Sequence, residues 1–252
     1  NALRDYARLL EMACEQWDLT GFHRALYEYH AEKMREIAGK FQAGIGYDYD
    51  AAMEKCRRKK KRKKKEDDFI NAFVEAYKDV YSKCEAVGIQ WLQFDEPALV
   101  QDMTEEDREL FVKMYSDILG KKKSCKVLLQ TYFGDVRDVY EDIVKLSFDG
   151  IGLDFIEGKK TAELIEKYGF PQDKLLFAGL VNGKNIWSNH YDRTLKILAQ
   201  LKEKNINVVL STSCSLLHVP YTLKHEHSLS QDYLSHFAFA EEKLGELHEL
   251  CI

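Results

Sequence analysis

The sequence predicts an α/β protein in which short strands alternate with helices and form a parallel sheet. Five apolar segments are each followed by a stretch with helical periodicity. Their apolar residues are consecutive rather than alternating, which is typical of strands buried on both faces of a parallel sheet built from βαβ units. The expected strands are residues 89–94, 126–131, 150–155, 174–181 and 207–211.

Helices are expected between these strands and before the first one. Residues 69–87 place Phe69, Phe73, Tyr77 and Tyr81 on one face at helical spacing. The first 65 residues contain no convincing strand but show helical patterns at 2–17 and 22–41. The helices expected between and after the strands cover 105–119, 136–146, 161–168, 193–204 and 231–250.

The number of strands limits the architecture. A closed (β/α)8 barrel requires eight strands, and only five are visible in the sequence. We therefore expect an incomplete (β/α)8-like barrel with a helical N-terminal segment. The predicted domains are 1–65, which carries a basic run, and 66–252, which carries the strands.

Composition excludes several classes of protein. The chain is 45% hydrophobic, which supplies enough apolar surface for a core and argues against general disorder. It has no apolar stretch long enough to cross a membrane and shows no secretory signal. Its six scattered cysteines form no CxxC pair, which indicates reduced thiols. We expect a cytoplasmic protein without membrane contact.

The net charge of −5 conceals a strong local asymmetry. Ten of the eleven residues from 55 to 65 are Lys or Arg. Without this run, 27 basic and 42 acidic residues leave a net charge of −15. The body of the chain is therefore acidic and a poor surface for nucleic acid, and we expect no nucleic-acid partner.

Polar residues follow the five expected strands at the points where each strand ends. In parallel α/β folds these carboxyl ends meet at one rim, where binding and catalytic groups collect. Helix capping and solvation explain many polar loop residues equally well. The candidates for a substrate-binding rim are Asp95, Glu96, Asp154, Asn185, Ser213 and Cys214.

Three of these strand ends resemble a known family. The segment 91–99 (WLQFDEPAL) is similar to the (W/I)QFDEPAL motif of cobalamin-independent methionine synthases. The segment 175–187 (LLFAGLVNGKNIW) resembles the family's LFAGVVDGRNIW, and 208–218 (VVLSTSCSLLH) resembles its VVSTSCSLLH. The three motifs occur in the family's order, and the resemblance covers about residue 67 to the C-terminus.

The resemblance implies a function for the complete enzyme. That family transfers a methyl group from 5-methyltetrahydropteroyl-polyglutamate to homocysteine with two barrels, and these motifs belong to the N-terminal barrel. Zinc, homocysteine and most of the folate are held by the C-terminal catalytic barrel, where zinc produces a reactive thiolate. The implied partners are therefore methyl-folate polyglutamate, homocysteine and the catalytic barrel.

The resemblance also implies that this half is not catalytic. At the positions where the catalytic barrel carries a His-x-Cys zinc pair, this sequence has Tyr132 and Gly134. Trp187 stands where that barrel has its catalytic histidine, and only Cys214 matches a zinc ligand. We expect no catalytic residue, no metal ligand and no cofactor in this chain, which alone should not be a competent enzyme.

Residues 1–65 depart from the family and leave alternatives open. The basic run at 55–65 can bind polyglutamate, nucleic acid or an acidic partner, or it can derive from a misjoined or frame-shifted segment. A second hypothesis is a stand-alone binding or scaffold module that docks acidic partners through this run. A third is an independent zinc methyltransferase that uses Cys214.

Overall fold

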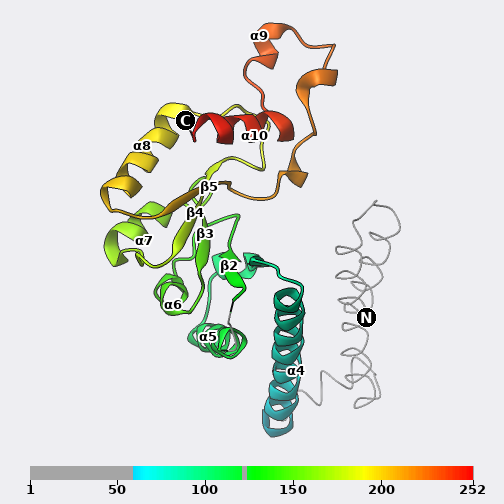
Figure 1. Cartoon of the computed structure of the whole chain (residues 1–252), viewed down its shortest axis with the longest axis vertical. Helices are drawn as coiled ribbons and strands as arrows, with labels where there is room; N and C mark the ends of the chain where they lie inside the picture. Colours follow the sequence, from blue (N-terminus) through cyan, green and yellow to red (C-terminus); the bar gives the residue numbers. More distant parts are fainter. Residues whose placement is uncertain (1–58, 121–123, 252) are drawn as a thin grey trace. The chain divides into compact units, whose positions relative to one another are not determined.

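The computed structural model describes residues 59–120 and 124–251, with side chains from residue 67 onward (Figure 1). The helices expected at 2–17 and 22–41 lie outside the described residues. The chain divides into two compact units, 1–82 and 83–252, each described by itself. No helix within the described part is long and apolar enough to cross a membrane.

Helix α4 (Lys59–Ala86) is the described element of the first unit and continues into the second. It begins ten residues before the helix expected at 69–87, inside the basic run. Adding residues to an existing helix gains one hydrogen bond each and avoids the cost of nucleation. Because residues 69–86 are amphipathic, they supply that existing helix. The ring centres of Phe73 and Tyr77 lie 4.8 Å apart along it, with the rings tilted by 34°.

The second unit is built on a five-stranded parallel sheet whose spatial order follows the chain, which confirms the predicted α/β class. Every strand begins and ends within two residues of its expected position. All neighbouring strands pair in parallel. The strands are β1 (Trp91–Asp95), β2 (Lys126–Gln130), β3 (Gly150–Asp154), β4 (Leu175–Val181) and β5 (Val208–Thr212).

The helices between the strands lie along one side of this sheet (Figure 1). Right-handed crossovers between successive neighbouring strands place every connecting helix on the same face. This is the arrangement of a barrel wall, whereas a doubly wound sheet reverses its strand order. The helices are α5 (Glu105–Leu119), α6 (Tyr140–Lys145), α7 (Thr161–Tyr168) and α8 (Tyr191–Glu203).

The two faces of the sheet differ in what covers them. Val127, Ile151 and Leu176 alternate onto the helix-covered face and have no exposed surface. On the opposite face, glycines leave space for neighbouring side chains to lie across the strands. A Cβ on Gly152 would stand 2.0 Å from the Gln130 side-chain oxygen. Only glycine at this position lets Gln130 pack flat against the sheet.

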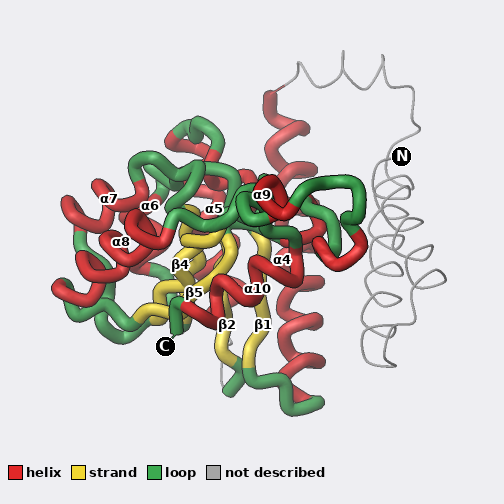
Figure 2. Tube along the Cα trace, turned by 90° about the horizontal axis from the view of Figure 1, so that it is seen from above, coloured by secondary structure: helices red, strands yellow, loops and turns green. Residues whose placement is uncertain are grey.

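The prediction of one closing helix at 231–250 is wrong, because the structure has two helices there. They are α9 (Gln231–Leu234) and α10 (Ala240–Glu249) (Figure 2). Between them, residues 235 and 236 form a turn, and the residues that follow pair with the loop after β4. Phe237 forms an antiparallel bridge with Trp187, and the Ala238 amide donates to the Ile186 carbonyl at 2.7 Å. These hydrogen bonds replace the helical ones.

Short 3₁₀ helices complete the second unit and lie just after β1 and β5. They are η1 (Pro97–Val100), η2 (Leu216–His218) and η3 (Leu223–His225). Helix α6 is shorter than the expected 136–146, since the residues before Tyr140 form turns instead. The outer edges of β1 and β5 have no strand partner within residues 59–120 and 124–251.

Candidate functional site

The carboxyl ends of the five strands form one rim, and β1 contributes Asp95 and Glu96 to it. Asp95 is exposed and accepts a hydrogen bond from the side-chain amide of Gln93 at 2.7 Å. Glu96 accepts a hydrogen bond from the Tyr115 hydroxyl of α5. Burial raises the pKa of Glu96; the Tyr115 hydrogen bond opposes this rise and the Asp95 charge adds to it. Glu96 therefore serves as a contact between β1 and α5, whereas Asp95 stays accessible.

Asp154, at the end of β3, organises two loops of the rim. Its side chain is 2% exposed and accepts three backbone hydrogen bonds, from Phe133 at 3.0 Å, Ile156 at 2.7 Å and Glu157 at 3.0 Å. Phe133 has a φ of 72°, which is rare for a residue other than glycine. Asp154 thus holds a strained turn after β2 in place. Burial raises its pKa, and the three backbone amides oppose that rise.

The loop after β4 is held by side-chain caps. The Asn182 side-chain oxygen accepts hydrogen bonds from the amides of Lys184 at 2.8 Å and Asn185 at 3.1 Å. The Asn185 oxygen in turn accepts one from the Trp187 amide at 3.2 Å. The predicted rim residue Asn185 therefore shapes its own loop through a local turn of the kind asparagine favours.

Ser213 and Cys214 follow β5 and are both buried, 3% and 5% exposed. The Ser213 hydroxyl accepts a hydrogen bond from the Gly183 amide at 3.2 Å. A Cβ on Gly183 would lie 2.3 Å from the Cys214 carbonyl oxygen, so the β4 loop packs directly on this backbone. Burial raises the pKa of the Cys214 thiol, which keeps it protonated.

Tyr132 lies at the rim in the loop after β2. Burial raises the pKa of its hydroxyl, and the negative charges of Asp95 and Glu96 raise it further. These two predicted rim residues are therefore close enough to Tyr132 to act on it electrostatically. The charge of Asp154 likewise raises the pKa of the Cys214 thiol. The structure brings these candidates to one rim, but their assignment to a substrate stays a prediction.

A second group at the rim was not among the candidates drawn from the sequence. Lys184 pairs with Glu157 at 2.9 Å and lies 5.2 Å from the centre of the Phe133 ring. The His218 ring also packs against Phe133, with 5.4 Å between the two ring centres. No local sequence pattern predicts the left-handed backbone of Phe133. The sequence therefore did not predict that Lys184 and His218 would lie beside its ring.

The residues around Cys214 do not fit a zinc ion. Tyr132 and Gly134 stand at the two positions where the resemblance places the His-x-Cys pair of the catalytic barrel. Both carboxylate oxygens of Asp154 already accept hydrogen bonds from backbone amides. The Lys184 ammonium also acts on Cys214 and carries the wrong charge for a cation site. Among the described residues, no group of three or more His, Cys, Asp and Glu side chains is positioned to hold a metal.

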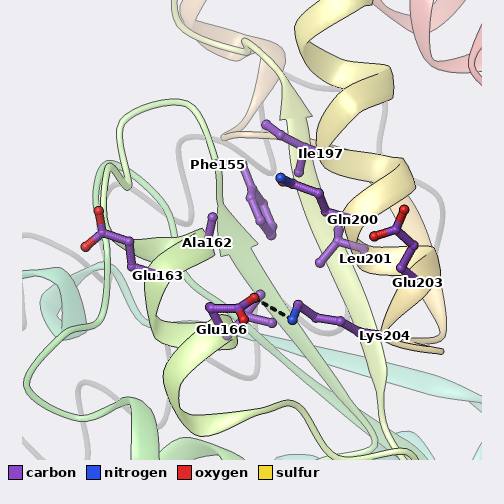
Figure 3. Close-up of a pocket in the computed structure, with 10 residues that line it drawn as sticks. Phe155, Ala162, Glu163, Glu166, Ile197, Gln200, Leu201, Glu203 and Lys204 are labelled. Carbon is purple, nitrogen blue, oxygen red and sulfur yellow. Dashed lines mark ion pairs between the residues drawn. The ribbon is translucent and has the colours of Figure 1, made fainter.

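A groove away from the rim group lies between α7 and α8. It has a volume of about 620 Å³, and Figure 3 shows Phe155 between the two helices with Gln200 and Leu201 opposite Ala162. Lys204 reaches across it to pair with Glu166. This groove between two neighbouring helices shares no lining residue with the rim candidates.

A parallel sheet wound in one direction, with polar groups at its carboxyl ends, defines a domain of the (β/α)-barrel class. Residues 52–206 match the family model described as cobalamin-independent synthase, N-terminal domain. The chain belongs to this family. The matched range includes the basic run as well as four of the strands, and the proposed boundary at residue 65 stays a prediction.

Curated relatives match this chain over a longer stretch than the family model. The 5-methyltetrahydropteroyltriglutamate–homocysteine methyltransferase of Lactococcus lactis subsp. cremoris (strain SK11) is 55% identical over 181 residues, which cover 72% of this chain and 24% of that protein. The protein of the same name from Streptococcus thermophilus is 55% identical over 183 residues, 73% of this chain and 24% of its own. The chain spans about a quarter of the length of the curated relatives it matches.

A solved structure shows the same fold at lower identity. It comes from Listeria monocytogenes and is described as a candidate vitamin-B12-independent methionine synthase. It is 20% identical to this chain with a TM-score of 0.50, and the superposition covers 58% of this chain and 48% of the other. At this identity the likeness supports the fold alone.

The role of Asp154 predicts a large loss of stability on its removal. Asp154→Ala should lower the free energy of unfolding by about 3 kcal/mol, because three backbone amides lose their carboxylate acceptor. Asp154→Asn should cost less, since one side-chain oxygen remains. Chemical denaturation of the purified variants measures both. The control is Glu157→Gln, which should change stability by less than about 1 kcal/mol; an equal loss in the control would contradict the assignment.

The burial of Cys214 predicts slow alkylation. Iodoacetamide reacts with thiolate, and the raised pKa of Cys214 lowers its thiolate fraction near pH 7.5. Exposed Cys251 should be modified at least about tenfold faster than Cys214. Peptide mass spectrometry over a time course measures the two rates, with the chain in guanidinium chloride as the control. Equal rates in the folded chain would show that Cys214 is an accessible, reactive thiol.

Proposed function

We propose that this chain is the supporting, non-catalytic part of a cobalamin-independent methionine synthase. In the complete enzyme a methyl group passes from 5-methyltetrahydropteroyltriglutamate to homocysteine. The observation that carries the proposal is the 55% identity, over 72% of the chain, to a protein named for this reaction. Such identity over one contiguous domain favours the same role within a longer protein.

The rim residues support the non-catalytic part of this proposal. Catalysis of methyl transfer to a thiol requires groups that lower the thiol's pKa, and zinc supplies this chemistry when it is bound in the family's other barrel. Here several polar residues of the rim form hydrogen bonds or are buried within the domain. Asp154 binds backbone amides, Ser213 accepts from Gly183, and the thiol of Cys214 is held protonated by burial. They fix loops rather than face a substrate.

The exposed part of the rim supports a contact with another domain. Asp95, Lys184 and His218 are exposed there, and polar groups of both charges suit an interface that is formed within one chain. In this proposal the rim meets the catalytic barrel, which holds zinc, homocysteine and most of the methyl-folate polyglutamate. The assembled enzyme would be cytoplasmic.

A chimera tests this proposal. The matched 181 residues of this chain replace the corresponding residues of the Lactococcus lactis SK11 protein, and methionine formation from homocysteine and 5-methyltetrahydropteroyltriglutamate is assayed. We expect activity within about tenfold of the parent, because a supporting barrel tolerates surface differences. The same transplant from the Streptococcus thermophilus protein is the matched control. A soluble, folded chimera without activity, next to an active control, would contradict the proposal.

A further inference from the structure

A small cleft beside the rim has an unusual lining. It has a volume of about 190 Å³, below the roughly 300–1,000 Å³ of pockets for drug-sized ligands. It lies where the loop after β4 enters α8, and Ile156 contributes from the loop after β3. Its apolar lining comes from Leu180, Trp187 and Ile197 together with Ile156. A ligand there would have to be small.

The charge of the cleft is opposite to that of the chain around it. Outside the basic run the chain carries a net charge of −15, and the groove between α7 and α8 is lined by Glu163, Glu166 and Glu203. No Asp or Glu lines the small cleft. Arg193 and His190 supply its charged and titratable groups, and amides and hydroxyls supply the rest. The cleft is therefore suited to an anion.

Arg193 is available to bind such an anion. Its side chain is exposed at the start of α8, and within residues 59–120 and 124–251 its guanidinium has no hydrogen-bond or ion-pair partner. A planar guanidinium binds a carboxylate through two parallel hydrogen bonds. Ser188 lines the same cleft, and its hydroxyl donates to the Ser235 carbonyl at 3.4 Å.

The wall that carries these groups is fixed by α10. The ammonium of Lys243, which has no exposed surface, donates to the Trp187 carbonyl at 2.9 Å. The Glu246 carboxylate accepts from the Asn189 amide at 2.6 Å, and the Thr194 hydroxyl donates to the Asn189 side chain at 3.0 Å. Residues 187–189 are thus held on both sides, which preorganises the cleft and lowers the entropic cost of binding.

We propose that this cleft binds a small organic carboxylate with an apolar body. The carboxylate pairs with Arg193 and the apolar part packs against Leu180, Ile197 and Trp187. The lining combines four apolar residues with seven polar ones, and Arg193 is the permanently charged group among them. This function goes beyond the proposed role as a supporting barrel and depends on none of its steps.

Benzoate titrated into the full ¹⁵N-labelled chain tests the proposal. Benzamide is the neutral analogue of the same shape, and inorganic phosphate is an anion without an apolar body. We expect saturable shifts of the backbone amides of residues 185–193 with benzoate, and at least about tenfold weaker binding of the other two. Absence of saturable shifts, shifts located elsewhere, or equally tight binding of phosphate would overturn the proposal.

Two variants and a matched control identify the contacts. Arg193→Ala should weaken benzoate binding about tenfold, and Ser188→Asp, which places a negative charge at the cleft, should abolish it. Lys196→Ala removes the same charge from an exposed position of α8 outside the cleft and should leave the affinity unchanged. An equal loss in Lys196→Ala and Arg193→Ala would show general electrostatic attraction and would overturn the site. Because methyl transfer is not measured, this result is independent of the chimera.

Discussion

The parallel pairing of strands in chain order is the constraint on which the rest of the second unit depends. It places α5 to α8 on one face of the sheet and all five carboxyl ends on one rim (Figure 1). The helix-covered face is then filled by aliphatic side chains without exposed surface, such as Val127 and Ile151. The other face is packed through glycines, where Gln130 lies across Gly152.

The arrangement of the strands explains why the rim is rich in polar residues. The rim residues whose hydrogen bonds are described above hold loops in place. Loops that leave five neighbouring strands present many backbone amides in a small volume, and buried amides need acceptors. Asp154 satisfies three of them, and Ser213 and Asn182 satisfy others. The need of these backbone amides for acceptors therefore accounts for much of the polar character of the rim.

Local sequence signals were sufficient for most of the fold. Helices α5 and α7 occupy their predicted ranges, because Thr104 and Asp107 form a capping box before α5 and Gly169, with a φ of 75°, ends α7. The division of the last helix was not predictable, since it depends on the pairing of Phe237 with Trp187, fifty residues earlier in the chain. The candidate rim residues were found by their position after strands, but their hydrogen bonds depend on the loops of neighbouring strands, which no local pattern describes.

The central claim is that this chain belongs to a methionine-synthase barrel that does not itself perform methyl transfer. The most direct measurement is a methionine assay on the purified 252-residue chain, supplied with zinc, homocysteine and 5-methyltetrahydropteroyltriglutamate, beside the Lactococcus lactis SK11 protein. We predict methionine from the latter and, from this chain, no more than in a reaction without protein. Methionine formed in proportion to the concentration of this chain would contradict the account.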